Sequence, residues 1–158
     1  LVQDAAYMVT VPYFCPDVEP LRSNPIFLYS SDRFQKPVPF SADIVISIDN
    51  VFEQKLEAIA AIESQVFEGG ANGSAAYVAT VPPASDPEAR IDWLRRRWES
   101  RQSSDANQYR ETLIQLYGEE RGNAVQYAEA YEICEYGRRP SLAEIKRLFP
   151  FIDDAKAP

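Results

Sequence analysis

A short apolar run followed at once by a helical pattern is the clearest local signal in the chain. Residues 43–48 read Asp-Ile-Val-Ile-Ser-Ile, and their β-branched side chains predict a strand buried on both faces, as is typical of a parallel sheet. Asp49 or Asn50 can cap the following helix, with Glu53 at the capping-box position, and two glycines at 69–70 end it. The apolar stripe of this helix consists of Phe52, Leu56, Ile59, Ile62 and Val66. A strand that leads directly into an amphipathic helix predicts an α/β fold.

The remaining strand signals are weaker. Residues 26–30 predict a second strand, and the proline-containing loop 31–42 after it is too short for a helical crossover. Residues 77–81 are a third, marginal candidate beside two prolines. Both main strands have the apolar character of sheet interiors, yet the chain offers few partners for them. We therefore expect strands of the sheet to be missing from these residues, and an exposed strand edge or apolar face to be covered by self-association.

The second half of the chain has mainly helical patterns. Asp86-Pro87-Glu88 combines a cap, a proline at the first helical position and an acidic first turn, and Ser141 with Glu144 forms a capping box. The inner stripe of the helix that starts at residue 86 is expected to be Ile91, Leu94 and Trp98. Further helices are expected at the start of the chain, from the cap Asp105 to Gly118, and over 123–136.

These patterns divide the chain into three parts. Residues 1–70 are expected to form part of an α/β core, 71–152 a helical elaboration, and 153–158 a disordered tail. At 158 residues the whole is the size of one ordinary domain.

Composition narrows the functional classes. The net charge of −8 argues against a nucleic-acid surface, which usually has the opposite sign. No run of about 18 apolar residues is present, so no membrane span is expected. Cys15 and Cys134 are far apart in sequence, so we expect two free thiols and a reducing, cytoplasmic location, with a disulfide as the less favoured alternative.

The chain contains no histidine. Histidine is the commonest general base and metal ligand near neutral pH, so a catalytic triad that uses it is excluded, and no short cysteine spacing suggests zinc. Polar residues do follow the strand over 26–30, where ligands bind in open α/β sheets. Asp32, Arg33 and Lys36 are therefore either the edge of a site or solvated loop charges.

Four stretches, taken together, resemble the C-terminal half of the PIG-L/LmbE family of zinc-dependent N-deacetylases. They are residues 1–8, 24–29, 43–65 and 127–131, and their order and spacing across nearly the whole chain carry the resemblance. Within the third stretch, the positions that match the family's D-I-x-V-x-I…K-x-x-A…S-Q run are the strand, Asp49, Lys55, Glu57, Ser64 and Gln65. The fourth stretch, Tyr-Ala-Glu-Ala-Tyr, is similar to the family's A-E-A-F segment.

The resemblance implies the late strands and C-terminal helices of a Rossmann-like fold, without its first strands and without the motifs that bind zinc. It implies a chain cut inside its first helix, with a frayed terminal helix as the alternative. The parent would use zinc to hydrolyse an N-acetyl group on an amino sugar or another N-acetylated small molecule. The fragment itself would have no cofactor, no catalytic residue and no metal ligand, and would pair with the missing half or form a homo-oligomer. The alternative is a non-catalytic carbohydrate-binding or protein-interaction module related to that family.

Three residues are candidates for contact with the substrate. Glu129 occupies the family's A-E-A position, expected on a helix, where it faces either the pocket or a structural arginine. Tyr29 and Asp32 lie at the carboxyl end of a predicted strand. Ile62 stands where relatives often have a polar residue, so no polar role is carried over to that position.

Overall fold

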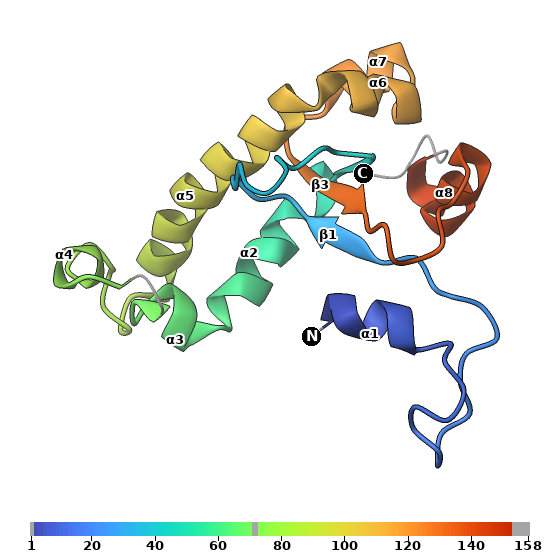
Figure 1. The fold of residues 1–158 in the computed structure, drawn as a ribbon. Helices are drawn as coiled ribbons and strands as arrows, with labels where there is room; N and C mark the ends of the chain where they lie inside the picture. The colour runs from blue at the N-terminus through green and yellow to red at the C-terminus, as the bar shows by residue number, and fades with distance from the viewer. Residues whose placement is uncertain (1, 71–72, 153–158) are drawn as a thin grey trace.

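The computed structural model describes residues 2–70 and 73–152 (Figure 1). The fold is mixed α/β, as expected. Its elements in chain order are α1 (Val2–Met8), β1 (Leu28–Ser30), β2 (Ile44–Ser47), the 3₁₀ turn η1 (Asp49–Val51), α2 (Phe52–Ala60), α3 (Glu63–Val66), α4 (Ala75–Val78), α5 (Pro87–Gln108), α6 (Arg110–Tyr117), α7 (Glu119–Ala124), β3 (Ala128–Ile133), α8 (Leu142–Leu148) and the 3₁₀ turn η3 (Pro150–Ile152). The tail predicted over 153–158 lies outside the described residues.

The three strands form one sheet in the order β1-β3-β2. Both outer strands pair with β3 in the antiparallel sense, with Tyr29 opposite Glu132 and Ile46 opposite Glu129. The strand predicted over 43–48 is confirmed, and all four residues of β2 are buried. The parallel pairing expected from that burial is wrong, because β2 pairs with β3 in the antiparallel sense. The burial of β2 arises instead from the helices that pack against it.

The central strand is the largest departure from the sequence prediction. We expected a helix over 123–136, but β3 occupies 128–133 and brings a part of the chain predicted to be helical into the middle of the sheet. Alanine and glutamate favour helices intrinsically, but pairing with two strands outweighs that local preference. The pattern of burial has the strand period of two over its first half, since Ala128 and Ala130 are buried and Glu129 is not.

The expected strand over 77–81 is also wrong. Residues 75–78 form the short helix α4, whose cap Ser74 accepts a hydrogen bond from the Tyr77 backbone N–H. The prolines at 82–83 follow directly and remove two backbone donors that a strand would need. This segment therefore has only one turn of helix and contributes no strand to the sheet.

Several helix ends are confirmed. Asp86 caps α5 by accepting a hydrogen bond from Ala89 N at 3.0 Å, and Ser141 caps α8 by accepting from Glu144 N at 3.3 Å. Gly118 ends α6 with φ of 86°, a conformation that glycine adopts without strain. Asp105 does not cap a new helix, because α5 continues through it to Gln108.

The helix predicted after β2 is broken into short pieces. It begins with η1, and α2 ends at Ala60, well before the glycines at 69–70. Asp49 makes no cap. Its carboxylate instead accepts hydrogen bonds from the backbone N–H groups of Gln126 and Tyr127, the latter at 2.6 Å, and so holds the start of β3. Glu53 pairs with Arg95 of α5 rather than closing a capping box.

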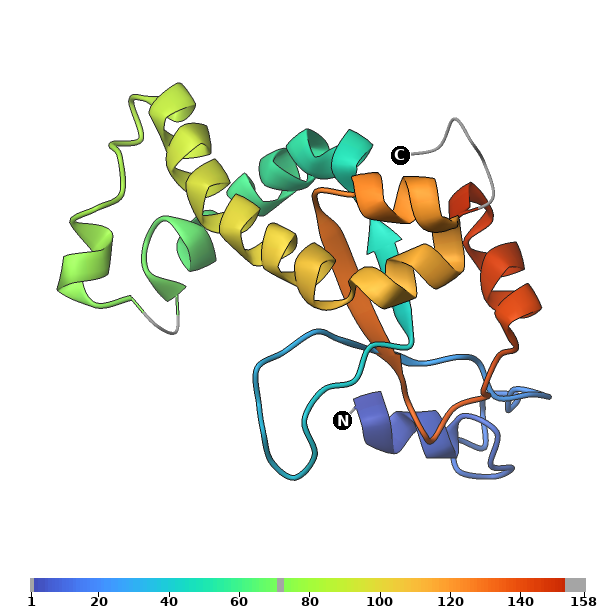
Figure 2. The same ribbon diagram turned by 90° about the horizontal axis from the view of Figure 1, so that it is seen from above.

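Two apolar clusters support this arrangement. One lies against the sheet and joins β2 and β3 to α6, α8 and η3; its fully buried members include Ile44, Val45, Leu113, Ala128 and Ile152. The other joins α2 to the first half of α5; its buried members are Ile48, Phe52, Leu56, Phe67, Trp93 and Leu94. Helix α5 passes across the sheet and links the two clusters (Figure 2).

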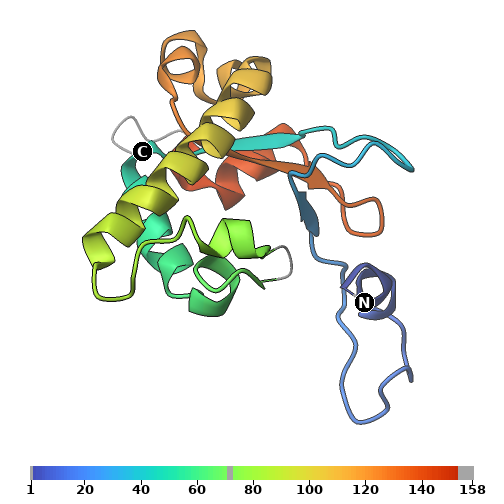
Figure 3. The same ribbon diagram turned by 90° about the vertical axis from the view of Figure 1, so that its left-hand side faces the viewer.

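The N-terminal segment extends away from this body (Figure 3). It is attached by Asn24, whose side-chain amide donates to Ala6 O at 3.0 Å and to Tyr136 O at 2.8 Å. Cys15 in this segment and Cys134 after β3 are both free thiols, as expected. Of the helices in the described ranges, none combines the length and the apolar character that crossing a bilayer requires.

We predict that Asp49→Ala lowers the free energy of unfolding by about 1–3 kcal/mol, because two backbone donors at the start of β3 lose their acceptor. Urea denaturation measures the change. The control is Asn50→Ala at the neighbouring exposed position, which should leave the free energy of unfolding nearly unchanged. Equal effects of the two substitutions would contradict the role given to Asp49.

Candidate functional site

The strand registers separate the candidate residues. Along β3, successive side chains point to opposite faces of the sheet. Glu132 and its partner Tyr29 therefore share one face, and Glu129 and Tyr131 lie on the other. The structure consequently brings Tyr29 and Asp32 together at one hollow and places Glu129 at a different one.

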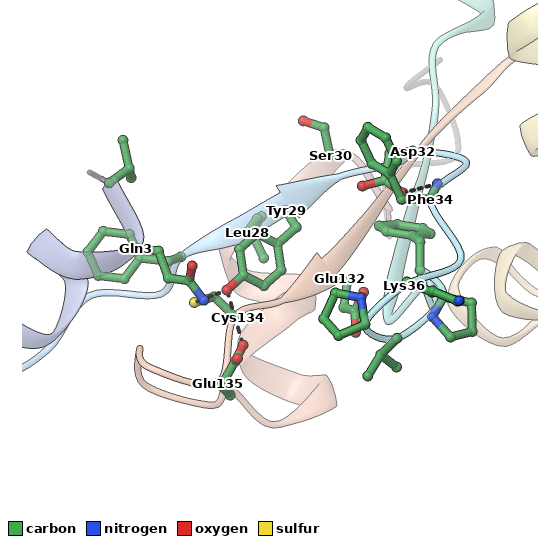
Figure 4. Close-up of a pocket in the computed structure, with 16 residues that line it drawn as sticks. Gln3, Leu28, Tyr29, Ser30, Asp32, Phe34, Lys36, Glu132, Cys134 and Glu135 are labelled. Atoms are coloured by element: carbon green, nitrogen blue, oxygen red, sulfur yellow. Dashed lines mark hydrogen bonds between the residues drawn. The ribbon is translucent and has the colours of Figure 1, made fainter.

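The larger hollow has a volume of ≈ 690 Å³ and lies over β1, bordered by α1 and the loop 32–40 (Figure 4). The Tyr29 hydroxyl donates a hydrogen bond to Glu135 Oε2 at 3.1 Å, and the Cys134 thiol donates to the Tyr29 hydroxyl at 3.1 Å. The bond with Cys134, followed by burial and by Glu135, raises the pKa of Tyr29. The carboxylate of Asp32 accepts from the Phe34 backbone N–H at 2.9 Å, so it stabilises a turn of the loop.

The smaller hollow has a volume of ≈ 230 Å³ and lies between α2, α5 and β3, just past the carboxyl end of β1. Its centre is Glu129, which accepts hydrogen bonds from Lys55 Nζ on one carboxylate oxygen and from the Tyr131 hydroxyl on the other. Gln102 is 3% exposed beneath them. With its amide oriented to satisfy both neighbours, it accepts from Lys55 Nζ at 2.7 Å and donates to Ala128 O.

Local charges and burial set the protonation of this cluster. Burial alone would raise the pKa of Glu129, but the hydrogen bonds from Lys55 and Tyr131 outweigh it and hold that pKa below its ordinary value. Burial, and then the hydrogen bond to Glu129, raises the pKa of Tyr131. At neutral pH the Glu129 carboxylate is therefore ionised and the Tyr131 phenol is neutral.

An aromatic side chain and further polar groups line the same hollow. The ring of Trp98 has Lys55 Nζ at 5.3 Å and the Arg101 guanidinium carbon at 5.4 Å from its centroid. On the strand side, the Ser31 hydroxyl donates to Asp105 Oδ2 at 2.9 Å. The hollow thus offers an indole ring beside fixed donors and acceptors, which suits a small hydroxyl-bearing ligand.

Sequence reasoning identified only part of this arrangement. The sequence indicates Glu129 as a candidate and Lys55 only as a position of the resemblance. Trp98 was expected in the apolar stripe of α5, and it does pack there, but it also lines the hollow. Residues 98, 101, 102 and 105 share one face of a helix. That spacing could have identified them if the helix had not been predicted to end before Asp105.

The residues present do not fit a catalytic zinc site. The chain has no histidine, and across residues 2–70 and 73–152 no group of three or more cysteine, aspartate or glutamate side chains is placed to hold a metal ion. Catalytic zinc sites use three protein ligands, most often including histidine. These residues therefore support no reaction step through a metal.

Comparison with protein families, curated proteins and solved structures found no match to this chain.

We predict that Glu129→Gln reduces the loss of stability in acid. The pKa of Glu129 is lower in the folded chain than in the unfolded one, so its ionised form stabilises the fold above about pH 4.3, the unfolded pKa. That contribution disappears as the pH falls through the folded pKa. Urea unfolding from pH 7 to pH 3 should therefore show a smaller decrease for Glu129→Gln than for the unmodified chain.

At neutral pH the same substitution should lower the free energy of unfolding by about 1–3 kcal/mol, because Lys55 loses a charged partner in a partly buried site. Glu57→Gln, at an exposed position on α2, is the matched control. If the two variants have the same stability at every pH, the ion pair has no energetic role.

We also predict that the 158-residue chain, dialysed against buffer without chelator after loading with zinc, retains well below one equivalent. Elemental analysis measures the content. One tightly held zinc per chain would show that these side chains do form a zinc site.

Proposed function

We propose that this chain provides substrate-binding structure in a zinc-dependent N-deacetylase of the PIG-L/LmbE type that acts on an N-acetylated amino sugar. In this proposal the smaller hollow, over Glu129, binds the sugar. The zinc ligands and the general base of such an enzyme are not among these residues, so the chain by itself has no deacetylase activity.

The pairing of Lys55 with Glu129 is the main support. These residues come from two of the four stretches that carry the resemblance, and they are 74 positions apart in the chain. Three of the four stretches contribute the three strands of the sheet. Three of the four stretches on which the resemblance rests therefore belong to one connected structure rather than to unrelated surface segments.

The proposal extends to the fold. Because β1 and β2 both run antiparallel to β3, they run in the same direction as each other. Two such strands with an antiparallel strand between them are compatible with the late part of a Rossmann-like sheet, in which mixed pairing is common. The first strands of that sheet are, in this proposal, outside these residues.

The chemistry of the hollow suits a sugar ring. The indole of Trp98 can cover an apolar ring face, while the cluster of Lys55, Glu129 and Tyr131 can exchange hydrogen bonds with hydroxyl groups. None of these residues is assigned a catalytic role. They would orient the ligand, and Gln102 would hold Lys55 in place from below.

A non-catalytic carbohydrate-binding module is the second candidate. It shares the hollow lined by Trp98, Lys55 and Glu129, and it requires no metal ligands. Both candidates require sugar binding, and they differ in turnover. Protein purified from its source cell should release acetate from its sugar substrate if it is a deacetylase, and should bind the sugar without release if it is a module.

Titration of the ¹⁵N-labelled chain with N-acetyl-D-glucosamine tests the shared requirement. We predict shifts of the amide signals of Ser31 and of residues 129–131, with a millimolar dissociation constant. Trp98→Leu keeps apolar packing but removes the ring, and should weaken binding by about three- to tenfold. Arg96→Ala, at an exposed position on the same helix, is the control and should bind as the unmodified chain does.

Absence of shifts at these amides with roughly 100 mM sugar would contradict the proposal. Shifts that occur only around the larger hollow would show that the sugar binds there and not at the proposed site.

A further inference from the structure

One edge of the sheet has free hydrogen-bonding groups. The bonds from Ser31 N to Ala130 O at 3.0 Å and from Cys134 N to Phe27 O at 2.9 Å show which residues of the β1 segment face β3. Because the direction alternates along a strand, Tyr29 also faces β3, and the backbone groups of Leu28 and Ser30 point away from it. No strand in the described part of the chain pairs with β1 on that outer side.

The larger hollow lies over β1, on the face of the sheet that carries Tyr29 and Glu132. All three residues of β1 line this hollow. The side chain of Leu28 packs against the core on the opposite face of the sheet. Leu28 therefore contributes its backbone to the hollow. The loop wall carries apolar side chains that are well exposed, with Phe34 and Val38 each at 73%. An unpaired strand edge beside an exposed apolar wall is the geometry used for strand addition.

The charges of the hollow restrict what can occupy it. Among the described residues that line it, Asp32, Glu132 and Glu135 stand against one cation, Lys36. Glu132 accepts a hydrogen bond from Ser41 N and Glu135 accepts one from the Tyr29 hydroxyl, which fixes both carboxylates at the rim. An acidic rim around an apolar wall favours a segment with basic and apolar side chains, since alternate residues of a strand point to opposite sides.

We propose that the outer edge of β1 binds an extended segment of another polypeptide, in which apolar residues alternate with lysine or arginine, as a fourth strand of the sheet. The backbone N–H and C=O groups of Leu28 and Ser30 pair with the segment. Its apolar side chains pack on the loop wall, and its basic side chains approach the acidic rim. This inference is independent of the proposed sugar site, which lies on the other face of the sheet.

The probe is the peptide acetyl-Lys-Val-Lys-Val-Thr-Lys-amide, added to the ¹⁵N-labelled chain. We expect shifts and slowed exchange of the Leu28 and Ser30 amides. A peptide methylated at every backbone nitrogen has no N–H to donate to the carbonyl groups of Leu28 and Ser30, and one with glutamate in place of lysine is repelled. Each should bind at least about tenfold more weakly.

The variant Ser30→Pro removes the one outward N–H of Ser30 without removing a bond to β3, and proline is tolerated at such edge positions. It should weaken the binding of the lysine peptide by about tenfold, whereas Ser30→Ala should leave that binding unchanged. Glu135→Gln keeps the acceptor for Tyr29 and should weaken binding through the loss of charge.

Three results would overturn the proposal. The first is equal binding of the methylated peptide. The second is the absence of shifts at Leu28 and Ser30 with the lysine peptide. The third is concentration-dependent sedimentation of the chain alone that is abolished by Ser30→Pro, since the occupant of the edge would then be a second copy.

Discussion

The pairing of β3 with two strands that lie far earlier in the chain is the constraint on which the rest of the structure depends. Without β3, the short strands β1 and β2 would have no ladder partner, and neither is long enough to be stable alone. Asp49 fixes where β3 begins, and Lys55 ties its second residue to α2. Helix α5 then crosses the sheet beside them and provides Gln102 and Trp98. The same contacts that hold the sheet together therefore build the smaller hollow.

The local parts of this fold could be predicted from the sequence. The strand over 43–48 and the starts of α5 and α8 follow from apolar runs and capping residues, which act within a few positions of the chain. The middle of the sheet could not be predicted this way, because Ala-Glu-Ala has a high intrinsic preference for helix and its strand state depends on distant partners. The capping assignment of Asp49 failed for the same reason: its acceptors found backbone donors 77 and 78 residues away.

The candidate site shows the same division. Glu129 was identified from the resemblance, but its surroundings depend on the antiparallel register, which places it on the opposite face from Tyr29. Placing the two on opposite faces requires the register of the pairing, and the sequence does not encode that locally. The result is a sheet with two different surfaces. One carries a compact charged cluster beside an indole ring, and the other carries an acidic hollow over β1.

Amide hydrogen exchange followed by NMR tests the central claim most directly. The account predicts slow exchange along β3, because its amides bond alternately to β1 and β2, and slow exchange of Tyr29 between rapidly exchanging Leu28 and Ser30. Rapid exchange throughout 128–133, or helical chemical shifts over those residues, would show that β3 is not the central strand. The sheet, the division into two hollows and both proposed sites would then have to be abandoned together.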